Sequence, residues 1–148
     1  MSSNSLDRIP DLCAIGRTVE WISVARNNIK TISPENISCL KALQQLVIYS
    51  NPISTLPDLM SLLPSFKGLY IYSSRLGDSS SIPLECDCGV AWLKDFEGTL
   101  EIHPTPCHSP PSLVNTKWSS ITKRHWIEIC RESIFLYFTL ISSSYQPL

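Results

Sequence analysis

Three segments of the chain repeat one spacing of apolar residues, and this spacing constrains the fold more than any other feature. The segments start at Val19, Leu43 and Phe66, so the period is 24 and then 23 residues. In each segment apolar residues stand at the first, fourth, sixth and eleventh positions. A period of this length indicates supersecondary units that stack side by side and bury a shared core.

Each repeat is expected to contribute one short strand. The strands should be centred on Ile22–Val24, Leu46–Ile48 and Leu69–Ile71, because apolar residues alternate there and period-2 alternation turns one side of a strand toward a core. Prolines recur between the strands. Because proline interrupts regular helices, short helical turns or irregular chain are expected in these return segments.

The ninth position of the repeat predicts a ladder of inward-facing amides. Asn4, Asn27 and Asn51 occupy this position. A buried amide is tolerated when it is hydrogen-bonded, so these side chains should bond backbone groups at each bend. Ser74 replaces the asparagine in the last repeat, and Arg75–Ile82 adds residues before the next motif. A bulge is therefore expected at this junction.

The Leu-x-x-Leu-x-Leu-x-x-Asn-x-Leu pattern of residues 1–82 resembles leucine-rich repeats. The resemblance implies an α/β fold, a solenoid with a short parallel β-sheet and an irregular or helical convex side. Residues 4–10 match only the second half of a repeat, so the first repeat is interpreted as truncated and the chain as a piece of a longer protein. The alternative is a degenerate first repeat.

Residues 83–130 follow a different pattern, with closely spaced cysteines, a tryptophan and a Cys-x-Ser-Pro-Pro-x-Leu run. The cysteines are Cys86, Cys88, Cys107 and Cys130. This segment resembles the cysteine-rich C-terminal cap of extracellular leucine-rich-repeat proteins. The resemblance implies the disulfides Cys86–Cys107 and Cys88–Cys130. The rival interpretation is a zinc site that adds His108 to three of these cysteines, but structural zinc sites usually have two or more residues between paired cysteines.

The other parts of the chain after residue 82 are less regular. A short amphipathic helix is expected over residues 90–96, and a helical turn near residues 119–129. Residues 131–148 form an apolar and serine-containing tail of unknown role. Its run Ile134–Ile141 is shorter than the roughly 20 residues that cross a bilayer. It fits a truncated span, an element that packs on the cap, or an artefactual extension of the reading frame.

Disulfides indicate an oxidising compartment. The N-glycosylation sequon at Asn36, in a return segment, agrees with this location. Cys13 and Cys39 are expected to be buried thiols, and a disulfide between them is left open. The sequence as written shows no signal peptide. An extracellular or cell-surface location, and any membrane attachment, is therefore expected to depend on sequence outside this chain.

Residues between the core positions of the strands are expected to lie on the concave face of the sheet. Two columns are predicted: Ala25 with Tyr49 and Tyr72, and Ser23 with Val47 and Tyr70. We predict that Trp21, Tyr49, Tyr70 and Tyr72 bind a protein or glycan ligand, because these aromatic side chains offer large contact areas at low entropic cost. The alternative is that tyrosine stands there only because it suits exposed strands.

Charge and motifs argue against other classes of function. The 12 Lys and Arg residues and 13 Asp and Glu residues give a net charge of −1, so no nucleic-acid partner is expected. The histidines show no metal-ligand spacing, and there is no Gly-rich phosphate loop or nucleophile elbow. No catalytic residue, metal or cofactor is predicted, and the chain is not expected to be an enzyme.

The sequence therefore predicts a protein–protein interaction module. It would be the C-terminal part of a secreted or cell-surface receptor or matrix protein that binds through its concave sheet. The alternative is a truncated structural end cap with no ligand of its own.

Overall fold

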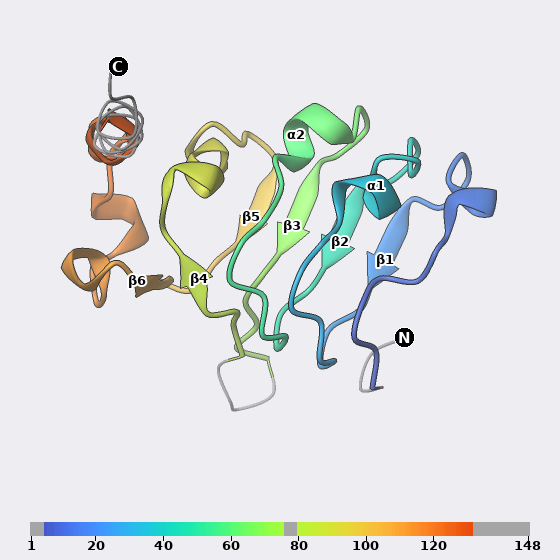
Figure 1. Ribbon diagram of the computed structural model, residues 1–148, viewed down its shortest axis with the longest axis horizontal. Helices are drawn as coiled ribbons and strands as arrows, with labels where there is room; N and C mark the ends of the chain where they lie inside the picture. Colours follow the sequence, from blue (N-terminus) through green and yellow to red (C-terminus); the bar gives the residue numbers. More distant parts are fainter. Residues whose placement is uncertain (1–4, 76–79, 132–148) are drawn as a thin grey trace, which may run out of the picture.

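The computed structural model describes residues 5–75 and 80–131 of the chain. These residues form a mixed α/β structure with a parallel sheet, which confirms the expected class. The sheet has the order β1-β2-β3-β5, and its strands lie side by side in chain order (Figure 1). The strands are β1 Trp21–Ser23, β2 Gln45–Val47, β3 Gly68–Tyr70 and β5 Thr99–Glu101. The tail beyond residue 131 and Asn4 of the expected ladder lie outside the described residues.

The strand register follows the sequence repeat. Ile22 pairs with Leu46, and Leu46 pairs with Leu69, so each repeat adds one strand to the sheet. These three central residues are 5%, 0% and 0% exposed and point into the core. The same register aligns Ser23 with Val47 and Val47 with Tyr70, which confirms one predicted column.

The return segments contain single turns of helix, as the prolines predicted. They are η1 Cys13–Ile15, α1 Pro34–Ile37 and α2 Leu59–Leu62. Pro34 opens α1, where its missing N–H costs no helical hydrogen bond. Asp58 caps α2 by accepting hydrogen bonds from the backbone N–H groups of Met60 and Ser61. These segments provide the crossovers that parallel strands require.

Asn27 and Asn51 form the described part of the amide ladder. The Asn51 side chain is 4% exposed, and its Oδ1 accepts from the Ile29 N–H at 3.0 Å. Its Nδ2 donates to the carbonyls of Val24 and Ile48, both at 3.0 Å. Each ladder amide thus bonds the backbone of the preceding repeat as well as its own.

The junction after β3 contains the expected bulge. Ser73 and Ser80 pair in an antiparallel bridge, so the chain returns to the same place on either side of the extra residues. Ser74 is exposed and does not join the ladder. The Ser81 hydroxyl instead donates to the Ile71 carbonyl at 3.4 Å, and Ile71 lies one repeat after Ile48. Ser81 therefore takes over the ladder position that the sequence pattern assigned to Ser74.

The cap continues the fold of the repeats. Its elements are β4 Leu84–Glu85, η2 Cys88–Lys94, β6 Cys107–Ser109, η3 Pro111–Leu113 and η4 Trp118–Ser120. Residues 123–131 are also helical. The helix expected over residues 90–96 is the 3-10 segment η2, and the strand β5 was not expected. Buried cap residues such as Val90 and Trp126 belong to the same apolar cluster as the cores of the repeats. Among the described residues, no helix is long and apolar enough to cross a bilayer.

All six cysteines are paired. The cap contains Cys86–Cys107 and Cys88–Cys130, the two pairs that the resemblance implied, with sulfur–sulfur distances of 1.94 and 2.15 Å. Because these sulfurs bond one another, they offer no thiolate to zinc.

The expectation that Cys13 and Cys39 are buried thiols was wrong, because the structure joins them in a disulfide with Cα atoms 5.4 Å apart. They lie in consecutive return segments, which stack closely enough to bring these Cα atoms within reach of a disulfide. Gly16 allows the close approach: a Cβ there would lie 2.3 Å from the Cys39 carbonyl oxygen. Cys13 is also exposed rather than buried.

Candidate functional site

The predicted ligand-binding residues lie on one side of the sheet. Trp21 and Tyr70 belong to β1 and β3, and Tyr49 and Tyr72 follow the ends of β2 and β3 by two residues. Side chains alternate along a strand, so these residues point away from the core that Leu46 and Leu69 fill. We call the surface formed by Trp21, Tyr49, Tyr70 and Tyr72 the aromatic face.

The aromatic face encloses a hollow of about 460 Å³, and all four predicted side chains line it. Ser23 and Val47 also line it. These two are smaller than the aromatic side chains around them, and the difference in size creates the hollow. Trp21 is 59% exposed, which is unusual for so large an apolar side chain.

Gly68 shapes one wall of the hollow. A Cβ at this position would lie 3.2 Å from Cε2 of the Tyr70 ring and 3.3 Å from Cγ of Gln45. The missing side chain lets the Tyr70 ring lean over Gly68, where its hydroxyl lies 3.5 Å from Oε1 of Gln45. The orientation of the Tyr70 ring therefore depends on the glycine two residues earlier in the same strand.

The predicted column of Ala25, Tyr49 and Tyr72 needs one correction. Ala25 is 1% exposed and does not contribute to the open surface. The next residue, Arg26, has a φ of 59°, so the chain turns at the end of the strand. Ser50, one repeat later, has a φ of 58°, yet the larger Tyr49 still reaches the hollow.

The cap adds residues to the aromatic face that sequence reasoning missed. Glu101 of β5 aligns with Tyr70 and lines the hollow. Arg75, which precedes the cap in the chain, also lines the hollow. The His103 ring packs edge-on against Tyr72, with ring centroids 5.0 Å apart. The Thr105 N–H donates to Nδ1 of His103 at 3.0 Å and holds the ring in place. The signal that could have found them is the alternation Thr99-Leu-Glu-Ile-His103, a weak strand pattern with exposed polar residues.

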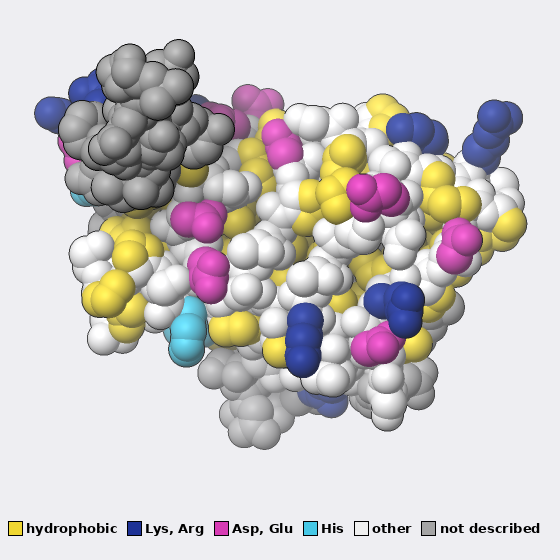
Figure 2. Space-filling model, viewed as in Figure 1, with side chains coloured by type: hydrophobic (Ala, Val, Ile, Leu, Met, Phe, Trp, Pro, Cys, Tyr) yellow, Lys and Arg dark blue, Asp and Glu magenta, His cyan; other side chains and the backbone are white. Residues whose placement is uncertain are grey.

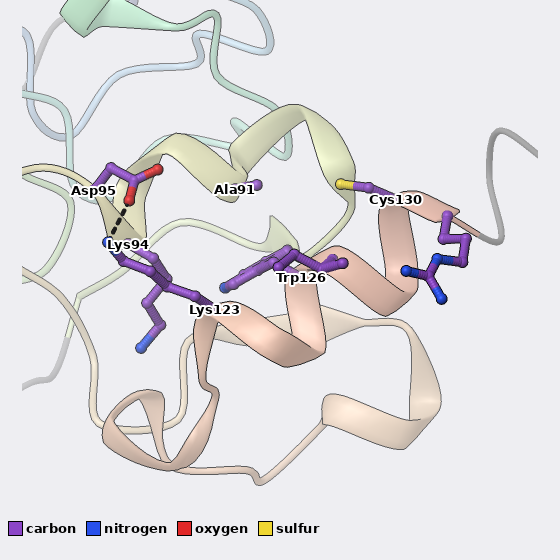
Figure 3. A pocket seen from close by; sticks show the side chains of 8 residues that line it. Ala91, Lys94, Asp95, Lys123, Trp126 and Cys130 are labelled. Carbon is purple, nitrogen blue, oxygen red and sulfur yellow. Dashed lines mark ion pairs between the residues drawn. The ribbon is translucent and has the colours of Figure 1, made fainter.

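A second hollow, here called the cap groove, lies between η2 and the helical residues 123–131 (Figure 3). Its volume is about 490 Å³. The lining residues are Ala91, Lys94, Asp95, Lys123, Trp126, Ile127, Cys130 and Arg131. In Figure 3 the Trp126 side chain extends between the two segments and forms one wall.

The two lysines of the cap groove have different environments. Burial lowers the pKa of the Lys94 ammonium. This ammonium donates to the Trp118 carbonyl and lies 3.9 Å from the centroid of the Trp118 ring. The hydrogen bond to Asp95 and the charge of that carboxylate raise the pKa of Lys123, and the two groups are 2.6 Å apart.

On the face shown in Figure 2, Lys and Arg side chains are scattered among Asp and Glu. Among residues 5–75 and 80–131, no three His, Cys, Asp or Glu side chains gather as a metal site would require. Asn36, the residue of the sequon, is half-buried in α1.

Comparison with known proteins finds similarity to vasorin from two species. The chain is 30% identical to human vasorin and 29% identical to mouse vasorin, each over 118 residues. The match covers 75% of the chain but only 16% of either vasorin. A match of this length is longer than the repeats or the cap alone, so it includes parts of both. No model of a known protein family matches the chain.

Proposed function

We propose that the described residues form a short leucine-rich-repeat solenoid with a disulfide-bonded C-terminal cap, and that this unit is a protein–protein interaction module. Its binding surface is the aromatic face. The observation that carries the proposal is that four side chains selected from sequence spacing line one hollow. Similarity to vasorin across repeats and cap supports a single architecture for the two parts.

The chemistry of the hollow suits a protein ligand. Tyrosine and tryptophan are enriched in interface hot spots because they offer an apolar ring and a polar group with few rotatable bonds. Arg75 and Glu101 place opposite charges at the hollow, and neither forms an ion pair among the described residues. Such charges would orient a partner more than they would tighten its binding.

The proposed location is extracellular or at the cell surface. Three disulfides in a small chain favour an oxidising compartment. A glycan at Asn36 is part of the proposal. Because α1 belongs to a return segment and not to the aromatic face, a glycan there would leave the hollow open.

A binding screen with matched variants tests the proposal. The oxidised chain would be screened against purified secreted and cell-surface proteins and against a glycan array. For a protein hit, Tyr49→Ala with Tyr72→Ala should weaken binding at least tenfold, as expected for hot-spot residues. Met60→Ala is the control, because Met60 is 42% exposed in α2 and does not line the hollow.

Three other outcomes of the screen would contradict the proposal or change it. A ligand whose affinity is unchanged in the double variant would contradict binding through the aromatic face. A hit on the glycan array alone would change the class of partner. Binding to neither set would favour the alternative of a structural end cap without its own ligand.

A further inference from the structure

The cap groove has the features of a small-molecule site and is separate from the aromatic face. Its volume of about 490 Å³ lies within the range of drug-sized sites, roughly 300–1,000 Å³. The walls are apolar, with Ala91, Trp126 and the Cys130 sulfur among them. Ile127 is 58% exposed at the groove, although a large aliphatic side chain normally avoids water.

The charged groups of the cap groove favour an anion. Lys94, Lys123 and Arg131 line the groove, and Asp95 is the one carboxylate among its lining residues. Asp95 is already paired with Lys123, and the Lys94 ammonium is held by Trp118. Among the described residues, the Arg131 guanidinium has no ion-pair partner. A guanidinium beside an apolar wall is suited to bind a carboxylate through two hydrogen bonds.

We propose that the cap groove binds a single-chain carboxylate of the fatty-acid type. The hydrocarbon chain lies against Trp126 and Ile127, and the carboxylate meets Arg131. An inorganic anion would leave the apolar walls in water, and a neutral hydrocarbon would leave Arg131 without a partner. An amphiphile with an anionic end satisfies both parts of the groove.

Calorimetry on the full oxidised chain tests this proposal, with octanoate, decanoate and dodecanoate below their micellar concentrations. One molecule should bind, and affinity should rise about fourfold for each added methylene until the groove is full. Nonyltrimethylammonium has the same nine-carbon alkyl chain as decanoate with the opposite charge. It should bind at least about tenfold more weakly, because charged hydrogen bonds to the carboxylate are lost.

Two neighbouring arginines provide a matched pair of variants. Arg131→Gln should weaken decanoate binding about tenfold. Arg124→Gln should leave it unchanged, because Arg124 does not line the groove and lies 3.6 Å from Glu128. Ile127→Ser should weaken every chain length, and an unchanged circular dichroism spectrum would show that these variants are folded.

The proposal is overturned if decanoate does not bind, if affinity does not depend on chain length, or if the two arginine variants behave alike. One combination of results would show that a second copy of the chain occupies the groove. If decanoate does not bind and Ile127→Ser converts a dimer to a monomer, the groove is an interface between two copies of the chain. None of these results depends on the aromatic face, so failure here would leave the proposed function untouched.

Discussion

Asn51 shows how much of the repeat stack depends on one side chain. Its amide makes three hydrogen bonds at 3.0 Å to the backbone, and two of them join the preceding repeat. Replacing Asn51 with Ala would leave buried N–H and C=O groups without partners. We expect the free energy of unfolding to fall by about 3 kcal/mol. Guanidinium denaturation followed by circular dichroism measures it.

Asn27 is the matched control at the residue scale. It accepts from the Leu6 N–H at 3.1 Å and donates to the Val24 carbonyl at 2.8 Å, as Asn51 does with Ile29 and Ile48, but it is half-buried. Water can replace part of what Asn27→Ala removes, so a loss of about 1 kcal/mol is expected. Equal losses for Asn27→Ala and Asn51→Ala would show that burial does not set the strength of the ladder.

The candidate binding residues were predictable because strand alternation assigns each residue to one face. Trp21 and Tyr70 needed nothing beyond that rule. Ala25 failed it because its short side chain is 1% exposed, whereas the larger Tyr49 reaches the hollow although the same positive-φ turn follows it. Glu101 and Arg75 were missed for other reasons. Glu101 stands outside the repeats, so no period placed it beside the tyrosines. Arg75 is the tenth residue of the third repeat, beyond the alternating strand positions, so the strand rule assigned it to no face.

At the scale of elements, β5 joins the cap to the sheet through a close contact at Gly98. A Cβ on Gly98 would lie 2.2 Å from the Lys67 carbonyl oxygen, which accepts a hydrogen bond from the Thr99 N–H at 2.8 Å. Gly98→Ala must therefore displace backbone and weaken the pairing of β5 with β3. We expect a loss of about 2 kcal/mol in the free energy of unfolding, measured by chemical denaturation.

Gly89→Ala is the control for this prediction. A Cβ on Gly89 would meet only Oδ1 of the Asp87 side chain, at 3.1 Å, and this exposed side chain can shift by a few tenths of an ångström while it still caps η2. A change within about 0.5 kcal/mol is expected. If Gly98→Ala is equally mild, the β5–β3 contact is not as rigid as its geometry indicates.

The Cys13–Cys39 disulfide staples two return segments. It spans 26 residues, so in the chain-entropy model it contributes about 3.5 kcal/mol. Replacing both cysteines with serine should lower the free energy of unfolding by that amount. The aromatic hollow should keep its shape, because neither cysteine lines it. A variant that also loses ligand binding would show that the staple positions the aromatic face.

Elements differ in how well the sequence predicts them. The first three strands follow a period, and their alignment was evident from Ile22, Leu46 and Leu69. The β5 strand pairs Thr99 with Gly68, an offset of 31 residues that matches no repeat. The pairing of Cys13 with Cys39 was likewise hidden, because it depends on how the return segments stack rather than on the strand pattern.

At the scale of the whole molecule, repeats and cap share one apolar core. The buried cluster runs from Ile9, near the start of the described residues, through Leu46 to Trp126 in the cap, without a break between the two parts. The sheet also continues through β5. Stacked repeats can unfold piece by piece when their contacts are weak. A shared core and sheet should instead make unfolding cooperative.

Cooperativity is tested by measuring the unfolding of the repeats and of the cap with separate probes. Trp21→Phe leaves Trp92, Trp118 and Trp126, all in the cap, so tryptophan fluorescence of this variant reports on the cap alone. Hydrogen exchange of the β1 and β2 amides reports on the repeats. In the oxidised protein both should give the same free energy of unfolding, as a two-state transition requires. A cap that unfolds at a lower denaturant concentration than the repeats would show that β5 and the shared core do not couple them.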